Sequence, residues 1–261
     1  MNLFDIIKVL EQQFPPEYQE GYDNSGLQIR SGNDEISACL VTLDVTENIV
    51  DEAITKHCNL ILSHHPVIFG KGLMRITGQN PAQRIVAKCL KNGISIYSAH
   101  TNVDAVKSGT SAVMAKRLGI SNIEILLPAT ETGEHGSGAI GILDQPTPIM
   151  DFLQKVKDVF ACGAISYTEP IKPLVSKIAF CSGSGSFLLN EAIKHKADVF
   201  ISSDFTYHKF FDTEKRILIA DIGHYESEIG IKDVFSDVLT KNFNTFAVII
   251  SQENTNPIKY L

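Results

Sequence analysis

The feature that most constrains the fold of this chain is an internal repeat. When the sequence is shifted by 139 residues, segment 36–65 aligns without a gap with segment 175–204. The run Glu52–Ile54 then falls on an identical run, Glu191–Ile193. Few other positions are identical, so a chance similarity between two βαβ units is the alternative. The apolar pattern nevertheless agrees along the whole window, which favours two copies of one supersecondary unit.

The apolar pattern predicts an α/β protein in which helices alternate with mainly parallel strands. We expect helices over residues 2–13, 46–56, 81–90, 110–118, 149–160, 187–196 and 226–239. We expect strands over residues 27–29, 38–43, 60–62, 94–97, 139–143, 177–181, 199–201, 217–220 and 245–250. The expected domains are a first α/β domain of residues 1–127 plus 203–261 and a second of residues 128–202.

Composition and charge exclude several classes of function. The net charge of −7 and the absence of a Lys/Arg cluster give no strong nucleic-acid signal. No apolar run reaches membrane-spanning length, and Met1–Asp5 lacks the features of a signal peptide. The five cysteines are dispersed and form no C-x-x-C pair, which is typical of thiols in a reducing compartment. We therefore expect a cytoplasmic protein that acts on a small molecule.

The first repeat carries histidines directly after two apolar runs. One run leads into Ser63-His64-His65-Pro66, and the next leads to His100, with Asp104 four residues later. Ligand sites of α/β proteins lie beyond the carboxyl ends of strands, where these residues fall. Adjacent histidines can reach one centre only where the strand has ended, because consecutive strand side chains point to opposite faces. Each signal alone also fits a hydrogen-bonded histidine at a strand end.

The second repeat carries a similar pair, His224 and Glu228. A spacing of four places both side chains on one face of a helix, although a carboxylate that satisfies a helix end would show the same spacing. Imidazole and carboxylate together form the usual ligand set of borderline divalent metals. Several carboxylates suit two ions, and five protein ligands on two ions leave positions for water and substrate. The combined pattern therefore favours a catalytic metal site.

Four motifs in order resemble the NIF3 family, also called GTP cyclohydrolase I type 2: Asp23-Asn24-x-Gly26-Leu27, Ser63-His64-His65-Pro66, His100-Thr101-Asn102-x-Asp104 and Gly223-His224-x-x-Ser227-Glu228. This resemblance implies five metal ligands, with Glu228 bridging and His100 as a near neighbour: His64, His65, Asp104, His224 and Glu228. It also implies two intertwined α/β repeats with mostly parallel mixed sheets, in the compact form without an inserted domain. A homohexamer is the assembly that it implies.

The function expected from these residues is a dinuclear metal-dependent hydrolase that acts on a nucleotide-like or phosphorylated small molecule. If GTP is the substrate, activated water attacks the purine C8, opens the imidazole ring and releases formate. His100 or Glu226 would then transfer protons to ring nitrogens. The two ions could be zinc, manganese, iron or nickel. The alternative is a non-catalytic metal-binding or regulatory oligomeric protein.

The segment Cys181–Ser186 links an expected strand to an expected helix and contains Gly183 and Gly185. Such loops can hold phosphate with backbone N–H groups. However, no lysine follows as a P-loop requires, and the G-x-G-x-x-G fingerprint is absent. A tight strand-to-helix turn is therefore the favoured interpretation.

Overall fold

The computed structural model describes all 261 residues of the chain, which form two compact units. The first unit consists of residues 1–103 and 231–255, and the second consists of residues 104–230 and 256–261. The chain therefore passes between the units three times.

These units differ from the expected domain ranges. Residues 104–127, 203–230 and 256–261 were expected in the first domain, whereas the structure places all three segments in the second unit. The reason is strand pairing: β5 (Ile120–Pro128) and β10 (Leu218–Asp221) both hydrogen-bond within the sheet of the second unit.

The first unit is built on a five-stranded sheet with strand order β1-β4-β3-β2-β11. Only β1 is antiparallel to its neighbour. The strands are β1 (Gly26–Ile29), β2 (Ala38–Thr42), β3 (Leu60–Ser63), β4 (Ser95–Ser98) and β11 (Ala247–Ile250). The helices are α1 (Leu3–Gln13), η1 (Pro16–Tyr18), α2 (Glu47–Thr55), α3 (Pro81–Lys91) and α9 (Ile231–Asn242), and α4 (Thr101–Asp104) begins here.

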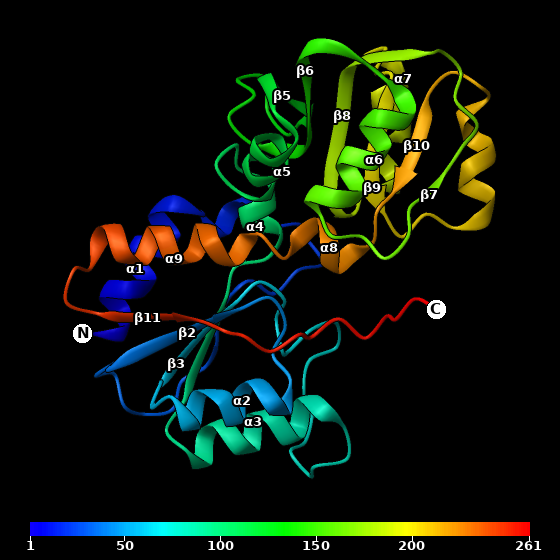
Figure 1. The fold of residues 1–261 in the computed structure, drawn as a ribbon. Coiled ribbons are helices and arrows are strands. Elements are labelled where there is room, and N and C mark those ends of the chain that lie inside the picture. Colours follow the sequence, from blue (N-terminus) through cyan, green and yellow to red (C-terminus); the bar gives the residue numbers. More distant parts are fainter. The chain divides into compact units, whose positions relative to one another are not determined.

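Helices cover both faces of this sheet, with α1 and α9 on one side and α2 and α3 on the other (Figure 1). Every residue of β2, β3 and β4 is therefore buried, as expected for parallel strands between two helical layers. The helices begin where the sequence supplies a cap. Asn80 accepts the N–H of Gln83 immediately before Pro81, and Thr46 accepts the N–H of Ile49.

The second unit is built on a six-stranded sheet with strand order β5-β6-β8-β9-β10-β7, in which β9 pairs in parallel with β8 and β10 and the other pairings are antiparallel. Its other strands are β6 (Gly136–Pro148), β7 (Ser166–Tyr167), β8 (Leu174–Ser184) and β9 (Val199–Ser203). Its helices are α5 (Thr110–Leu118), α6 (Ile149–Val159), η2 (Ser186–Leu188), α7 (Leu189–Lys194), η3 (Tyr207–Thr213) and α8 (His224–Glu228). Phe152 of α6 and Phe180 of β8 share one buried core with residues of α5, and Phe200 of β9 lies in a second core with residues of α7.

The repeat recurs in the hydrogen bonds of each unit. The register between β2 and β3 is reproduced between β8 and β9 after the same shift of 139 residues. At the equivalent loop position, Asn59 Oδ1 accepts the N–H of Ser37 at 2.8 Å, and Asp198 Oδ2 accepts the N–H of Ser176 at 2.7 Å. The same polar contact in both copies supports duplication over chance similarity.

The segment that follows each repeat belongs to the other unit. After the first repeat the chain forms α5, β5 and β6 of the second unit, and after the second repeat it forms α9 and β11 of the first. The expected α/β fold with two mixed sheets is confirmed. The expectation of mostly parallel sheets holds for the first unit, whereas the second sheet has more antiparallel than parallel pairings, because β5, β6 and β7 join it as antiparallel strands. None of the helices has both the length and the apolar character needed to cross a membrane.

Candidate metal centre

The first unit places its histidine pair just beyond the end of β3. The backbone N–H groups of His64 and His65 both donate to the carbonyl oxygen of Leu43, at 3.1 and 3.0 Å. Ser63 Oγ donates to the carbonyl oxygen of His65 at 3.0 Å. These bonds turn the chain out of the strand pleat, so the two rings lie together with their centroids 4.9 Å apart.

Each ring of the pair is held at Nδ1 by an oxygen atom. His64 Nδ1 lies 2.9 Å from the carbonyl oxygen of Ala99, and His65 Nδ1 lies 2.7 Å from Asp44 Oδ1. A carbonyl oxygen only accepts, so the proton of neutral His64 is on Nδ1 and the lone pair is on Nε2. Histidines that bind metals show this arrangement, because the acceptor fixes the tautomer and orients the ring.

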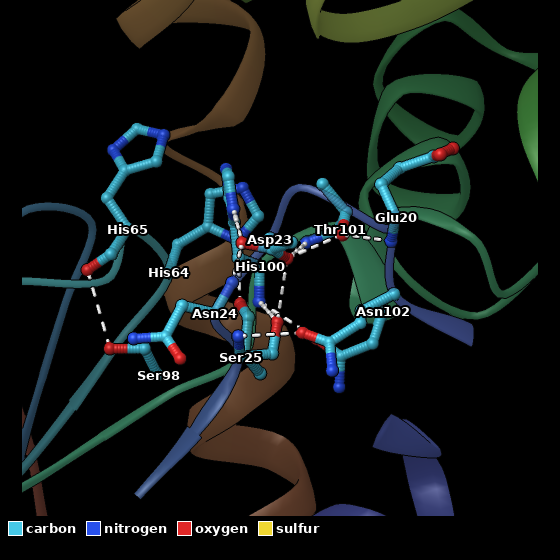
Figure 2. Close-up of polar contacts among 12 residues, drawn as sticks. Glu20, Asp23, Asn24, Ser25, His64, His65, Ser98, His100, Thr101 and Asn102 are labelled. Carbon is cyan, nitrogen blue, oxygen red and sulfur yellow. Dashed lines mark hydrogen bonds and ion pairs between the residues drawn. The ribbon is translucent and has the colours of Figure 1, made fainter. Parts of the chain in front are cut away.

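His100 joins this pair from the end of β4. Possible ligand atoms of His64, His65 and His100 all lie within 4.8 Å of one another. His100 Nδ1 lies 2.7 Å from Asp23 Oδ1, as Figure 2 shows. Asp23 also accepts the backbone N–H and the hydroxyl of Thr101, at 3.0 and 2.5 Å. The first unit therefore presents three imidazoles, each held at Nδ1, in one small volume.

Asp23 is ionised in this network. Burial raises the pKa of this carboxyl, but the hydrogen bonds from His100 and Thr101 and the charge of His100 outweigh it and hold the pKa well below its usual range. An ionised Asp23 only accepts hydrogen bonds, so Nδ1 of His100 carries a proton. Nε2 is then the nitrogen of His100 that can bind a metal ion or exchange a proton.

The second unit presents a different donor set on α8. His224 and Glu228, four residues apart, lie on the same face, with His224 Nε2 3.1 Å from Glu228 Oε2. On the other side of the ring, His224 Nδ1 lies 2.6 Å from Asp204 Oδ2. Burial lowers the pKa of His224, but the hydrogen bonds and charges of Glu228 and Asp204 outweigh it and raise the pKa to about 9. The metal-free site therefore favours a protonated His224.

Asp104 lies near Glu228 within the same unit. A carboxylate oxygen of Asp104 and one of Glu228 lie within 4.8 Å of each other, and Asp104 Oδ1 accepts the hydroxyl of Thr110 at 2.9 Å. Burial raises the pKa of the Cys181 thiol, and the charges of Asp104 and Glu228 raise it further. Two carboxylates and an imidazole form a set that suits a divalent ion.

The absence of a side chain at Gly183 makes room for this donor set. Gly183 has a φ of +59°, and a Cβ here would overlap Glu228 Oε1 and lie 3.3 Å from His224 Nε2. Its N–H donates to Ser227 Oγ at 2.8 Å, and Ser227 Oγ donates to the carbonyl oxygen of His224 at 2.7 Å. The expected loop Cys181–Ser186 is thus largely the end of β8. The N–H of Gly183 is engaged in fixing α8.

Glu226 is directed to different partners. Its Oε1 accepts from Asn256 Nδ2 at 2.9 Å, and a Cβ at Gly223 would overlap Oε2. A spacing of two residues from both His224 and Glu228 places Glu226 off the face that they share.

The two units therefore each assemble part of the predicted site. The first brings together His64, His65 and His100, and the second brings together Asp104, His224 and Glu228. The acceptors that orient the histidines, Asp23, Asp44 and Asp204, were not predicted for that role. Their positions in the sequence could have identified them: Asp23 lies in a turn motif, and Asp44 and Asp204 lie within two residues of a strand end.

The chain matches the family model Duf34/NIF3 (NGG1p interacting factor 3) over residues 1–257. A Clostridium perfringens relative named GTP cyclohydrolase 1 type 2 homolog is 32% identical over 263 residues, which cover 100% of both chains. A Schizosaccharomyces pombe relative named Protein NIF3 homolog is 30% identical over 268 residues, covering 96% of this chain and 95% of that protein. The solved structure of a Bacillus cereus protein related to NIF3 has the same fold, with a TM-score of 0.90 at 24% identity and coverage of 100% and 99%.

Proposed function

Because the chain belongs to the Duf34/NIF3 family, we propose that it binds two divalent metal ions and hydrolyses a nucleotide-like or phosphorylated small molecule. The name of the Clostridium perfringens relative makes GTP the first substrate to test. The proposed ligands are His64, His65, Asp104, His224 and Glu228, with Glu228 bridging the ions.

The observation that carries this proposal is the way the histidines of the first unit are held. His64, His65 and His100 converge within 4.8 Å, and each has its Nδ1 within 2.9 Å of a carbonyl or carboxylate oxygen. A histidine that only packs or caps a strand needs no such common orientation. Ligating histidines need it, because the second nitrogen must be presented as a neutral donor in a fixed direction.

Chain connectivity supports a centre shared by both units. Helix α4 contains the passage from Val103 to Asp104, so Asp104 follows His100 within about one helical turn. Glu228 lies two residues before Gly230, where the chain returns to the first unit. The chain thus crosses between the units beside two of the proposed ligands, Asp104 and Glu228. Carboxylates from one unit and imidazoles from the other would complete the coordination of two ions.

The ions would supply Lewis-acid chemistry and make hydroxide available near neutral pH. Asp23 holds the proton of His100 on Nδ1, so Nε2 can take a proton from the attacking water or deliver one to a substrate nitrogen. In GTP, one water added at C8 would open the imidazole ring to a formamide, and a second water would hydrolyse the formamide and release formate. Because Glu226 is engaged by Asn256, we assign proton transfer to His100.

Metal content tests the binding part of the proposal. We expect about two zinc or manganese ions per chain, as in other two-metal sites, measured by elemental analysis after loading and gel filtration. Glu228→Gln keeps the size of the side chain and removes its charge, so it should lose at least one ion while the circular dichroism spectrum stays unchanged. Glu131→Gln, at an exposed carboxylate in a turn of the second unit, is the matched control. Wild-type stoichiometry in Glu228→Gln contradicts the assigned ligand set.

Formate release from GTP tests the catalytic part. Activity should require added metal and disappear in His65→Ala, whereas His208→Ala, at an exposed histidine, should retain it. Turnover that survives both chelation and His65→Ala would place the reaction at another site. Fully metallated protein that hydrolyses neither GTP nor a panel of nucleotides and phosphoesters would favour a non-catalytic metal-binding role.

A further inference from the structure

The last residues of the chain form an extended segment that is fastened along its length. Residues 251–261, which we call the strap, follow β11 and contain no helix or strand (red in Figure 1). A segment without regular structure stays in place only through specific contacts, because ordering its backbone costs conformational entropy. The partners of the strap are therefore informative.

Within the first unit the strap contacts two carboxylates. Glu52 accepts the hydroxyl of Ser251 and, at 3.1 Å, the N–H of Gln252. Thr255 Oγ1 donates to Asp44 Oδ2 at 2.5 Å. The other oxygen of Asp44 lies 2.7 Å from His65 Nδ1. Thr255 thus fixes the plane of the carboxylate that orients His65.

Within the second unit the strap contacts the helix that carries His224 and Glu228. Asn256 Nδ2 donates to Glu226 Oε1 at 2.9 Å, in the middle of α8. The ring of Tyr260 packs directly on Gly163, where a Cβ would overlap it. Burial raises the pKa of Tyr260, and the charge of Glu226 raises it further, as expected for a phenol beside this carboxylate.

We propose that the strap is a positioning element of the metal centre. Thr255 and Asn256 are consecutive residues, and the division between the units falls at the peptide bond that joins them. That bond ties the carboxylate behind His65 to the helix that bears His224 and Glu228. The strap orients the carboxylate behind His65 in the first unit and holds α8 in the second, without contributing a ligand. The role of the strap in metal binding rests on the proposed function. The link that the strap forms between Asp44 and α8 does not.

Thr255→Val removes a contact of the strap in the first unit, and Gly163→Ala displaces Tyr260, a contact of the strap in the second unit. Thr255→Val keeps the shape of the side chain and removes the hydroxyl, and Thr255→Ser restores the hydroxyl. Gly163 has no positive φ, so alanine is excluded there only by the ring of Tyr260. Thr147→Val, at a partly buried strand position whose hydroxyl donates only to the carbonyl oxygen of Gln145, is the matched control.

The first measurement is zinc affinity by competition with a chelating dye. Thr255→Val and Gly163→Ala should each weaken at least one zinc site by about tenfold, the lower end of the effect of outer-shell partners. Thr255→Ser and Thr147→Val should bind as the wild type does. Wild-type zinc affinity in both Thr255→Val and Gly163→Ala overturns the proposal.

The second measurement is hydrogen exchange in chelator-treated protein. This measurement tests the link whether or not the wild type binds zinc. Thr255→Val should speed exchange in residues 224–228, although its lost bond lies in the first unit. Gly163→Ala should speed exchange around Asp44, although its clash lies in the second. If the strap does not couple the two units, exchange should change only beside each substitution, and that result overturns the proposal. Wild-type protein that binds no zinc but shows the crossed exchange effects rejects the proposed function and keeps the strap as a link.

Discussion

At the scale of single residues, the candidate centre depends on what stands behind each ligand. His64 faces a backbone carbonyl, His65 and His100 face carboxylates, and His224 lies between Asp204 and Glu228. A carbonyl fixes a tautomer without adding charge, whereas a carboxylate also places a negative charge beside the ring. The four rings therefore differ in electrostatic environment although all are imidazoles.

Gly183→Ala should disrupt the donor set of the second unit. The substitution places a Cβ against Glu228 and forces a non-glycine residue to a φ of +59°. Gly133→Ala is the control, because its φ of +63° imposes similar strain with nothing within 4 Å of the added atom. Both variants should lose about 1 kcal/mol of stability from strain, but only Gly183→Ala should lose zinc affinity. Equal zinc affinity in the two variants would contradict this role.

The raised pKa of His224 predicts how the stability of metal-free protein depends on pH. Its pKa is about 9 in the folded protein against an ordinary value of 6.5, so the folded state binds the proton more tightly. The resulting stabilisation is complete below about pH 6.5 and is lost as the pH rises through about 9. Chelator-treated wild type should melt at a lower temperature at pH 9 than at pH 6.5. His224→Gln should reduce this difference and His208→Gln should preserve it; the same difference in all three proteins would contradict the assignment.

At the scale of elements, regular amphipathic helices and buried parallel strands could be predicted from the sequence. The helix expected over 81–90 corresponds to α3, and the strand expected over 199–201 corresponds to β9. β5 was missed because its register shifts between Ser121 and Glu124, where Asn122 has a positive φ. The shift interrupts the alternation of apolar and polar residues on which a strand prediction relies.

One further difference is the single helix expected over 226–239, which the structure divides into α8 and α9 at Gly230. Helical periodicity continues through the break, so the periodic pattern gave no sign of it.

The metal ligands show the same limit of sequence patterns. The strand-end positions of the histidines could be predicted from the sequence. The orientation of His65, His100 and His224, however, depends on Asp44, Asp23 and Asp204, each 20 or more residues away from its histidine. Such long-range pairing leaves no periodic signal.

Gly230→Ala should destabilise the second unit where the chain leaves α8. A Cβ here would lie 2.5 Å from Val113 Cγ1 and 2.8 Å from Arg117 Nη2 on α5. Overpacking of this kind costs about 1–3 kcal/mol, which thermal or urea unfolding can measure. Gly21→Ala, with nothing within 4 Å and no positive φ, should be close to neutral. A Gly230→Ala variant as stable as Gly21→Ala would show that the side chains of α5 can move away from the added methyl group at little cost in stability.

At the scale of the whole molecule, the duplication extends beyond the aligned window. In both units an antiparallel edge strand, β1 or β7, precedes the repeat in the chain and pairs with the third parallel strand. Within the window, the residue after the C-cap of each helix has a φ of 56°, His57 in one copy and Lys196 in the other. The sequence window could not show this extent, because side chains outside the core diverged while the backbone path remained.

Assembly is the property of the whole molecule that follows from the family resemblance, and we propose a homohexamer. Surface aromatic residues support it: Tyr207 and Phe211 on η3 are 73% and 63% exposed, with ring centroids 5.3 Å apart. Exposed apolar patches of this kind often mark sites of interaction between proteins. Light scattering should give about six times the 28.7 kDa of one chain. Tyr207→Ser with Phe211→Ser should lower the mass, whereas Met74→Ser, at a residue 92% exposed, should not. A wild-type mass of 28.7 kDa at every concentration rules out the hexamer.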